Sequence, residues 1–200
     1  MVKHLKTLGL LAGIMLSAST FAASFEEGKH YVKVDGFAES HAPVVREFFS
    51  YNCPHCYRFD HTIADTVKLL GNEVQFERTP VSGVRPDWKM SQLAYYVAQK
   101  FKVTEQTHMP IFKQVQQVAP FRDEADVKAF FIAQGLKADA IDQALSSSDR
   151  QFTLMGFNTQ AELAGIRGVP SVLVNGKYML NVQGLSSEQL AELVKYVAKL

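Results

Sequence analysis

The only two cysteines of the chain, Cys53 and Cys56, lie within one helical turn of each other in the stretch FFSYNCPHCYRFD. A disulfide between them would close a very short loop, which removes little conformational entropy from the unfolded chain. Two cysteines in 200 residues are also too few for a fold held together by disulfides. This spacing therefore indicates chemistry at the sulfur atoms, and the fold has to present them for it.

The sequence around the cysteines predicts a strand followed by a helix. Residues 44–49, VVREFF, are nearly all apolar or aromatic, as in a central strand covered on both faces. Pro54 suits the first position of a helix, because its missing N–H would have no partner there. Apolar residues then recur at helical spacing up to a stop at Gly71–Asn72: Phe59, Ile63, Val67 and Leu70. Cys53 is thus expected at the N-terminus of a helix.

This position gives the two cysteines different roles. Unpaired backbone N–H groups and the helix dipole favour negative charge at a helix N-terminus, and such a site lowers the pKa of a thiol. His55 can add a positive charge or a hydrogen-bond donor, and Cys56 lies further into the helix and should be less exposed. We expect Cys53 to be the sulfur that attacks or is attacked, and Cys56 to resolve the mixed disulfide. Stabilising the Cys53 thiolate stabilises the reduced form, which is the property of an oxidant.

Two other uses of the cysteines stay open at this point. CPHC offers two thiolates and an imidazole to zinc, but a closed structural zinc site needs four ligands. There is no second cysteine pair, and the other histidines are scattered without ligand spacing: His30, His41, His61 and His108. A purely structural disulfide is the second alternative, and the short loop argues against it.

The rest of the chain predicts an α/β fold, a mixed sheet with helices on both faces and a helical insertion. Further strands are predicted at 31–34, 73–79 and 171–174, and Asn175–Gly176 predicts a hairpin into 177–180. Five helices are predicted between the third and fourth strands, at Leu93–Phe101, Pro110–Val118, 127–134, 138–145 and 149–164. Ser186 suits the N-cap of a terminal helix. With the breaker cluster Pro80–Pro86 as a boundary, we expect residues 24–85 and 161–200 to form the sheet domain and residues 86–160 the helical insertion.

Residues 1–23 have the pattern of a cleaved secretory signal peptide. Two lysines precede the apolar stretch LGLLAGIML, and small residues follow it up to Ala22 and Ala23. A membrane anchor is the alternative, but this stretch is well short of the roughly 20 residues needed to cross a bilayer. Removing Lys3 and Lys6 with the signal leaves 19 basic and 20 acidic residues, a net charge of −1. That charge gives no reason to expect nucleic-acid binding, and export suits a disulfide.

With these features together, the sequence resembles the DsbA family, the thioredoxin-fold oxidases of the bacterial periplasm. The stretch EFFSYNCPHC is similar to the active-site stretch of that family, and residues 168–178, GVPSVLVNGKY, resemble its proline loop and the following hairpin. The order of elements also fits over residues 24–200. An acidic nucleophilic thiol and a strongly oxidising couple are properties of the DsbA family, so they are implied here by the resemblance alone.

The resemblance implies roles for individual residues. Cys53 is similar to the family's nucleophile and Cys56 to its buried partner, and Pro54 and His55 resemble the dipeptide that tunes the couple, with His55 interacting with the Cys53 thiolate. Val169–Pro170 resembles the cis-proline bond that faces the disulfide; a trans proline is the alternative. The Val169 backbone would then pair with an extended substrate segment, a mode that barely reads side chains.

Glu47 is unusual on physical grounds, because it places a carboxylate inside the apolar run VVREFF. A buried carboxylate is costly unless it is paired. Glu47 resembles the family's buried acid, which influences proton transfer to the second sulfur, and its expected partner is Arg78. Arginine does not release its proton at ordinary pH, so any proton transfer would depend on Glu47 and water. A strand-end ion pair with no catalytic part remains the alternative.

We therefore expect a periplasmic thiol:disulfide oxidoreductase, a disulfide oxidase that donates its Cys53–Cys56 disulfide to reduced, unfolded exported polypeptides. The resemblance implies reoxidation by a quinone-linked membrane partner of the DsbB kind. We expect no cofactor, no metal and no nucleic-acid partner, and a monomer. A disulfide isomerase or reductase is one alternative, although CPHC argues against a reducing couple. A peptide-binding chaperone with an incidental disulfide is the other.

Overall fold

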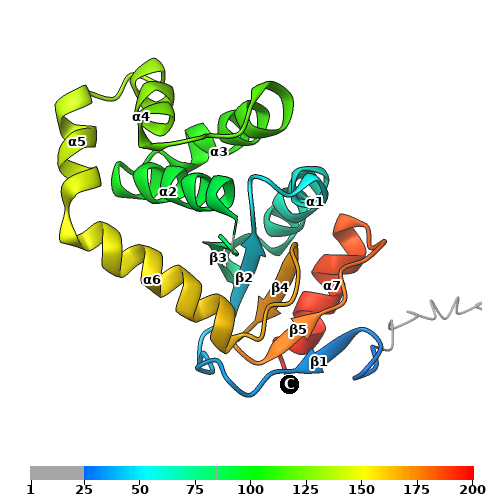
Figure 1. Cartoon of the computed structure of the whole chain (residues 1–200). Helices are drawn as coiled ribbons and strands as arrows, with labels where there is room; N and C mark the ends of the chain where they lie inside the picture. The colour runs from blue at the N-terminus through cyan, green and yellow to red at the C-terminus, as the bar shows by residue number, and fades with distance from the viewer. Residues whose placement is uncertain (1–24, 84) are drawn as a thin grey trace, which may run out of the picture.

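The computed structural model describes residues 25–83 and 85–200, so the predicted signal peptide lies outside the described residues. A five-stranded sheet with the order β1-β5-β4-β2-β3 forms the centre of the protein (Figure 1). β2 pairs in parallel with β3 and antiparallel with β4, and β5 pairs antiparallel with β4 and β1. The predicted mixed sheet is confirmed, with strands at Tyr31–Lys33 (β1), Val44–Phe49 (β2), Gln75–Pro80 (β3), Ser171–Val174 (β4) and Tyr178–Leu180 (β5).

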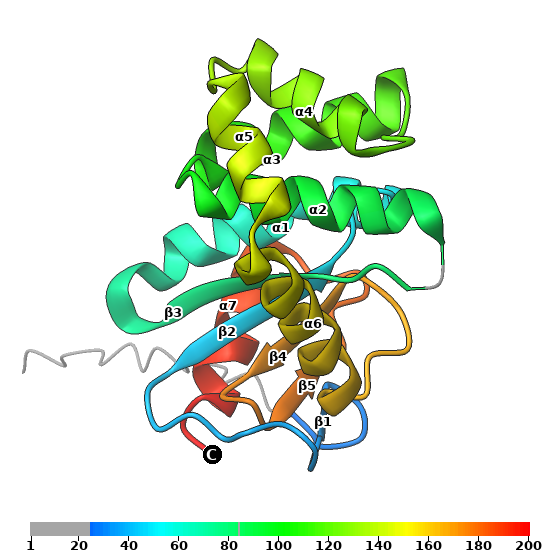
Figure 2. The same cartoon turned by 60° about the vertical axis from the view of Figure 1, so that its left-hand side comes forward.

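Helices cover both faces of this sheet. α1 and α7 pack together on one face, and α6 lies across the other, as Figure 2 shows with α6 in front of the strands and α7 behind them. α2 to α5 stack beyond one end of the sheet, above it in Figure 2. The helices are α1 (Pro54–Leu70), α2 (Pro86–Lys100), α3 (Thr104–Lys113), α4 (Glu124–Ala133), α5 (Ala138–Ser146), α6 (Ser148–Leu163) and α7 (Ser187–Val197).

The alternation of side chains along β2 and β4 explains why apolar residues occur at neighbouring positions in them. Val45 of β2 packs with α1 and α7, whereas Phe48 packs on the α6 side. In β4, Val172 and Val174 face α1 and α7, and Leu173 faces α6. Successive side chains of a strand point to opposite faces, so a strand covered on both sides buries apolar residues on each face.

The helical region and the end of β2 share one core. Residues 91–98 of α2 are all buried, so this helix is the centre of the region. Phe49, at the last position of β2, belongs to the same cluster, as do Tyr51 and both cysteines. The loop that carries Cys53 is therefore fixed between the sheet and the helical region.

Several predicted boundaries were wrong. The first helix of the helical region starts at Pro86, seven residues before the predicted Leu93. The second helix of the helical region begins at Thr104, so Pro110 lies inside it and does not open it. A proline inside a helix removes one backbone hydrogen bond. The next two residues, Ile111 and Phe112, are buried, and this packing holds the helix together. The third strand begins at Gln75, because Gly71–Glu73 first forms a turn of 3₁₀ helix.

Several other predicted elements are confirmed. Ser186 caps α7 and forms a capping box with Gln189, in which each residue bonds the backbone of the other. The turn at Asn175–Gly176 has positive φ angles of 55° and 70°, which is the geometry that Asn-Gly hairpins favour. In the part of the chain that the structure describes, no helix has the length and apolar character needed to cross a membrane.

Candidate active site

Cys53 is the N-cap residue of α1, as the sequence predicts. Its backbone is extended, with φ −91° and ψ 112°, and Pro54 occupies the first turn. The Cys53 sulfur accepts a hydrogen bond from the backbone N–H of Cys56 at 3.2 Å. The first turn of α1 contains no acidic residue, so the helix dipole acts on the sulfur without a competing negative charge.

The two thiols differ in environment and in pKa. Both are free in this structure; Cys56 is fully buried, and Cys53 is 6% exposed. A hydrogen bond from the Cys56 thiol lowers the pKa of Cys53 to about 6, against the effect of burial, with help from the backbone N–H groups of Cys56 and His55. Burial, and the hydrogen bond that Cys56 donates, raise the pKa of Cys56 above its ordinary value. Cys53 is therefore the thiolate near neutral pH, and Cys56 stays protonated.

His55 is exposed and pairs with a basic neighbour. Nη2 of Arg58 lies 2.9 Å from Nδ1 of His55, and a guanidinium can only donate, so Nδ1 accepts this bond. Nδ1 accepts only while the ring is neutral. The charge of a protonated His55 would be the smallest of the effects that lower the pKa of Cys53, behind the backbone and thiol donors. The predicted interaction of His55 with the thiolate remains a prediction.

The proline loop lies against the reactive sulfur. The Val169–Pro170 peptide bond is cis, as the resemblance implies. In its thiol form, Cys53 Sγ donates to the carbonyl oxygen of Val169 across 3.3 Å. This contact joins the N-terminus of α1 to the segment that precedes β4, and it leaves the Val169 backbone beside the place where a substrate sulfur has to arrive.

Glu47 and Arg78 form the predicted pair. They are direct neighbours across the parallel β2–β3 ladder, and Arg78 Nε donates to Glu47 Oε2 at 3.0 Å. Glu47 is 1% exposed. Burial raises the pKa of Glu47 to about 7, and the charge of Arg78 only partly offsets this. The charge of Glu47 also contributes, after burial and the bond to Cys53, to the raised pKa of Cys56.

The same arginine serves a second carboxylate that the sequence analysis missed. Asp60, on α1, has its Oδ1 3.4 Å from Arg78 Nη2 and 2.9 Å from His108 Nε2. Burial opposes the charge of Asp60, but the bond from His108 and the nearby positive charges outweigh it, so its pKa is lowered. Asp60 follows Cys56 by four residues and belongs to the buried side of α1. That spacing was the signal by which it could have been found.

His108 and Tyr51 complete this buried polar chain. The Tyr51 hydroxyl lies 2.8 Å from His108 Nδ1. Because Nε2 faces the Asp60 carboxylate, Nε2 donates and Nδ1 accepts from the hydroxyl. Burial lowers the pKa of His108, which agrees with a neutral ring in this arrangement. Nothing local in the sequence indicates this contact, because the two residues are 57 positions apart.

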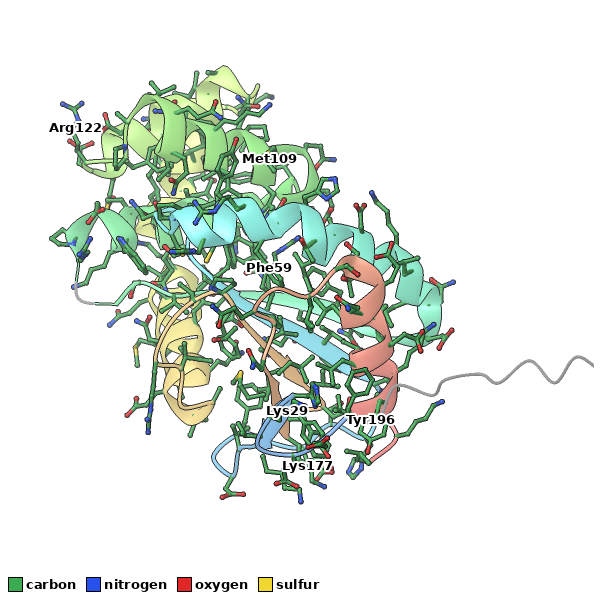
Figure 3. All side chains as sticks on the ribbon, turned by 90° about the vertical axis from the view of Figure 1, so that its right-hand side faces the viewer. Lys29, Phe59, Met109, Arg122, Lys177 and Tyr196 are labelled. Atoms are coloured by element: carbon green, nitrogen blue, oxygen red, sulfur yellow. The ribbon has the colours of Figure 1, made fainter. Side chains whose placement is uncertain are left out.

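An open groove of about 520 Å³ adjoins the proline loop and the start of α1. One wall is α1, including Phe59, which Figure 3 labels beneath that helix. The opposite wall is Val169–Pro170 and the segment from Leu180 to Leu185 between β5 and α7. An extended peptide could lie here with a cysteine against Cys53.

Across residues 25–83 and 85–200, no three side chains of His, Cys, Asp or Glu come together as a metal site. Both ring nitrogens of His108 are already engaged in hydrogen bonds, with the Tyr51 hydroxyl and the Asp60 carboxylate.

Comparison with known proteins gives one consistent family. The family described as "DSBA-like thioredoxin domain" matches residues 74–196. The thiol:disulfide interchange protein DsbA of Escherichia coli (strain K12) is 35% identical over an alignment of 204 positions, which spans 94% of this chain and 96% of that protein. This longer match includes the cysteine pair, which precedes the family match.

Solved structures agree in fold. The DsbA disulfide interchange protein of Klebsiella pneumoniae superposes with a TM-score of 0.79 at 23% identity, covering 90% of this chain and 100% of that one. Proteus mirabilis DsbA, in a complex with the non-covalently bound peptide PWATCDS, has a TM-score of 0.74 at 28% identity, covering 88% and 96%. With its thioredoxin-like sheet, its CPHC pair and these matches, the chain belongs to the DsbA family and is a thiol:disulfide oxidoreductase.

Proposed function

We propose that this oxidoreductase works as an oxidase, which donates the Cys53–Cys56 disulfide to reduced polypeptides exported to the periplasm. The observation that carries the proposal is the opposite displacement of the two thiol pKa values, Cys53 downward and Cys56 upward. A stabilised Cys53 thiolate is a good leaving group from the mixed disulfide with a client and favours the reduced product.

The reaction balances as two thiol–disulfide exchanges. A client thiolate attacks Cys53 Sγ of the oxidised protein, forms a bond to it and displaces Cys56 as the leaving sulfur. A second client thiolate then attacks the client sulfur of this mixed disulfide and displaces Cys53 as the thiolate. The client loses two electrons and the two protons of its thiols. The protein gains the two electrons and one proton, on Cys56, while Cys53 is left as the thiolate and the other proton goes to solvent.

Cys56 needs a proton when it leaves, because burial raises its pKa. Glu47 supports this step as a positioning residue: its pKa of about 7 lets it hold or release a proton near neutral pH, and it acts on Cys56 through its charge. Pro54 sets the helix start that stabilises the thiolate, and His55 adds a minor charge effect when its ring is protonated.

The groove supports a client bound in an extended conformation. The Val169 carbonyl stands beside Cys53, and a substrate backbone that pairs there would leave side chains largely unread. The peptide bound to the Proteus mirabilis relative contains a cysteine, which fits a client of this kind.

The proposal also covers the processing, domain arrangement, oligomeric state and reoxidation of the protein. We propose that residues 1–23 are removed as a signal, that residues 86–160 act as a helical insertion between the two parts of a sheet domain over residues 24–85 and 161–200, and that the protein acts as a monomer. A quinone-linked membrane oxidase of the DsbB kind would restore the disulfide, by accepting the two electrons that the client gave up.

Stoichiometric oxidation of a reduced, unfolded client by the oxidised protein tests the proposal. Disulfides in the client should form in step with the appearance of thiols on the protein. The Cys53→Ser variant should oxidise no client. Cys56→Ser, first coupled to a client as a mixed disulfide, should release that client only when a second client thiol is present. Client oxidation by Cys53→Ser would instead favour a chaperone, and an equilibrium with glutathione close to that of thioredoxin would favour a reductase.

A further inference from the structure

The groove beside Cys53 carries an unbalanced positive charge. Its lining includes Arg58 and His55 from α1, and otherwise consists of uncharged residues such as Phe59, Thr62 and Gln183. No carboxylate is among the lining residues, all of which lie in the described part of the chain. A ligand that enters the groove therefore meets the field of one permanent cation.

Among the described residues, Arg58 forms no salt bridge with a carboxylate. The other arginines with close partners have carboxylates, such as Arg122 with Asp126 and Arg78 with Glu47. Arg58 instead donates to His55 Nδ1 at 2.9 Å, and no carboxylate of the described residues lies within salt-bridge distance of it. One guanidinium N–H is used in this contact, and the planar group still has others to offer to a carboxylate.

We propose that Arg58 is a specificity-determining residue that favours client segments with an aspartate or glutamate near the reacting cysteine. The inference rests on the proposed function and adds a preference for acidic clients. The client cysteine has to reach Cys53, next to the Val169 carbonyl, while its neighbours lie along the groove past Arg58. A client carboxylate there completes a charge-assisted pair with the guanidinium.

The geometry of the helix sets the position of the acidic residue. Arg58 is five residues beyond Cys53 on α1, which is about 7.5 Å along the axis at about 1.5 Å per residue. An extended client advances about 3.3 Å per residue. The carboxylate that meets Arg58 should therefore belong to a residue two or three positions from the client cysteine.

The test uses three short reduced peptides with two cysteines, which differ only in an Asp, Asn or Lys two positions from the first cysteine. Their oxidation by excess oxidised protein is followed as a single turnover. Exposed ion pairs have modest strength, so the Asp peptide should react about two- to fivefold faster than the Lys peptide at low salt. The ratio should approach one at about 1 M salt, where the Debye length is about 3 Å.

The variants separate selectivity from chemistry. Arg58→Gln should reduce the Asp-to-Lys ratio to near one, and Arg58→Glu should reverse it. Arg122→Gln is the matched control, since it removes an exposed arginine at the outer edge of the helical region (Figure 3), and it should keep the wild-type ratio. An effect of Arg58 on Cys53 through His55 would change all three rates together and leave the ratio unaltered.

The outcomes are distinct. A wild-type ratio that persists in Arg58→Gln, or that does not reverse in Arg58→Glu, overturns the role of Arg58 while leaving the oxidase function intact. Failure of the wild-type protein to oxidise any of the three peptides contradicts the proposed function itself.

Discussion

The imidazole of His108 lies 2.9 Å from the carboxylate of Asp60, from Nε2 to Oδ1, and so joins α3 to the helix that carries the cysteines. Asp60 also contacts Arg78, which bonds Glu47 in turn. One guanidinium thus faces two buried carboxylates. Asp60 also accepts a hydrogen bond from His108, so its pKa is lowered and it keeps its charge. Glu47 has only Arg78, and burial raises its pKa to about 7.

Glu47→Gln should change how the stability of the reduced protein depends on pH. The folded-state pKa of Glu47 is raised from 4.5 to about 7, so the folded protein binds more protons than the unfolded chain between these values. Glu47 therefore lowers the free energy of unfolding as pH rises from about 4.5 to 7, by roughly 3 kcal/mol at about 1.4 kcal/mol per unit. Urea unfolding between pH 5 and 8 should show this loss in the wild type and a smaller one in Glu47→Gln.

Asp60→Asn is the control for this effect. The charge of Asp60 raises the pKa of Glu47, so removing it should move the Glu47-dependent loss of stability to lower pH. Parallel pH profiles for wild type and Glu47→Gln would contradict the assignment of this titration to Glu47.

Tyr51→Phe should lower the free energy of unfolding by about 1 kcal/mol or somewhat more, because it leaves Nδ1 of the buried His108 without its donor. A double-mutant cycle with His108→Leu isolates this contact. In the His108→Leu background, the loss of the hydroxyl should cost clearly less, as urea unfolding will show. Equal costs in both backgrounds would mean that the two side chains are not coupled.

Cys56→Ala should raise the pKa of Cys53, because the largest effect that lowers it is the hydrogen bond from the Cys56 thiol. Cys56→Ser keeps a donor at this place and should leave the pKa of Cys53 lower than in Cys56→Ala. The rate of alkylation of Cys53 by iodoacetamide as a function of pH measures both. If the pH midpoint of alkylation were the same in the two variants, the side chain of Cys56 would not be the cause of the lowered pKa of Cys53.

The thiolate should also stabilise the reduced fold. A thiol whose pKa is lowered from 9.0 to about 6 on folding adds stability that is present above the higher value and is lost as pH falls through the lower one. Cys53→Ser lacks this contribution, so the reduced wild type should gain stability relative to it from pH 6 to 9. Denaturant midpoints of the two reduced proteins that stay a constant distance apart would argue against a stabilised thiolate.

The parts of the site that are local in sequence could be predicted, and those that depend on tertiary packing could not. CPHC after an apolar strand places Cys53 at a helix start by short-range rules alone. The pairing of Glu47 with Arg78 follows because their strands flank one helix and pair in parallel. His108 was missed because it approaches Asp60 from α3, a helix whose start was predicted six residues too late.

The same distinction holds for the fold. The hairpin at Asn175–Gly176 and the cap at Ser186 depend on turn and capping rules and were predicted correctly. Proline is favoured at the start of a helix, which predicts a helix from Pro110, but packing of the surrounding turns keeps Pro110 inside α3. The groove beside Cys53 combines α1 with the segment before α7, which no local pattern brings together.

The central claim is that Cys53 is a stabilised thiolate near neutral pH. Ultraviolet absorbance at the thiolate band, followed in the reduced wild-type protein from pH 3 to 10 against the oxidised protein as blank, measures it directly. We predict a transition of one thiol with a midpoint near 6 that is absent in Cys53→Ser. A midpoint between about 8 and 9, the value of an ordinary cysteine, would contradict the claim.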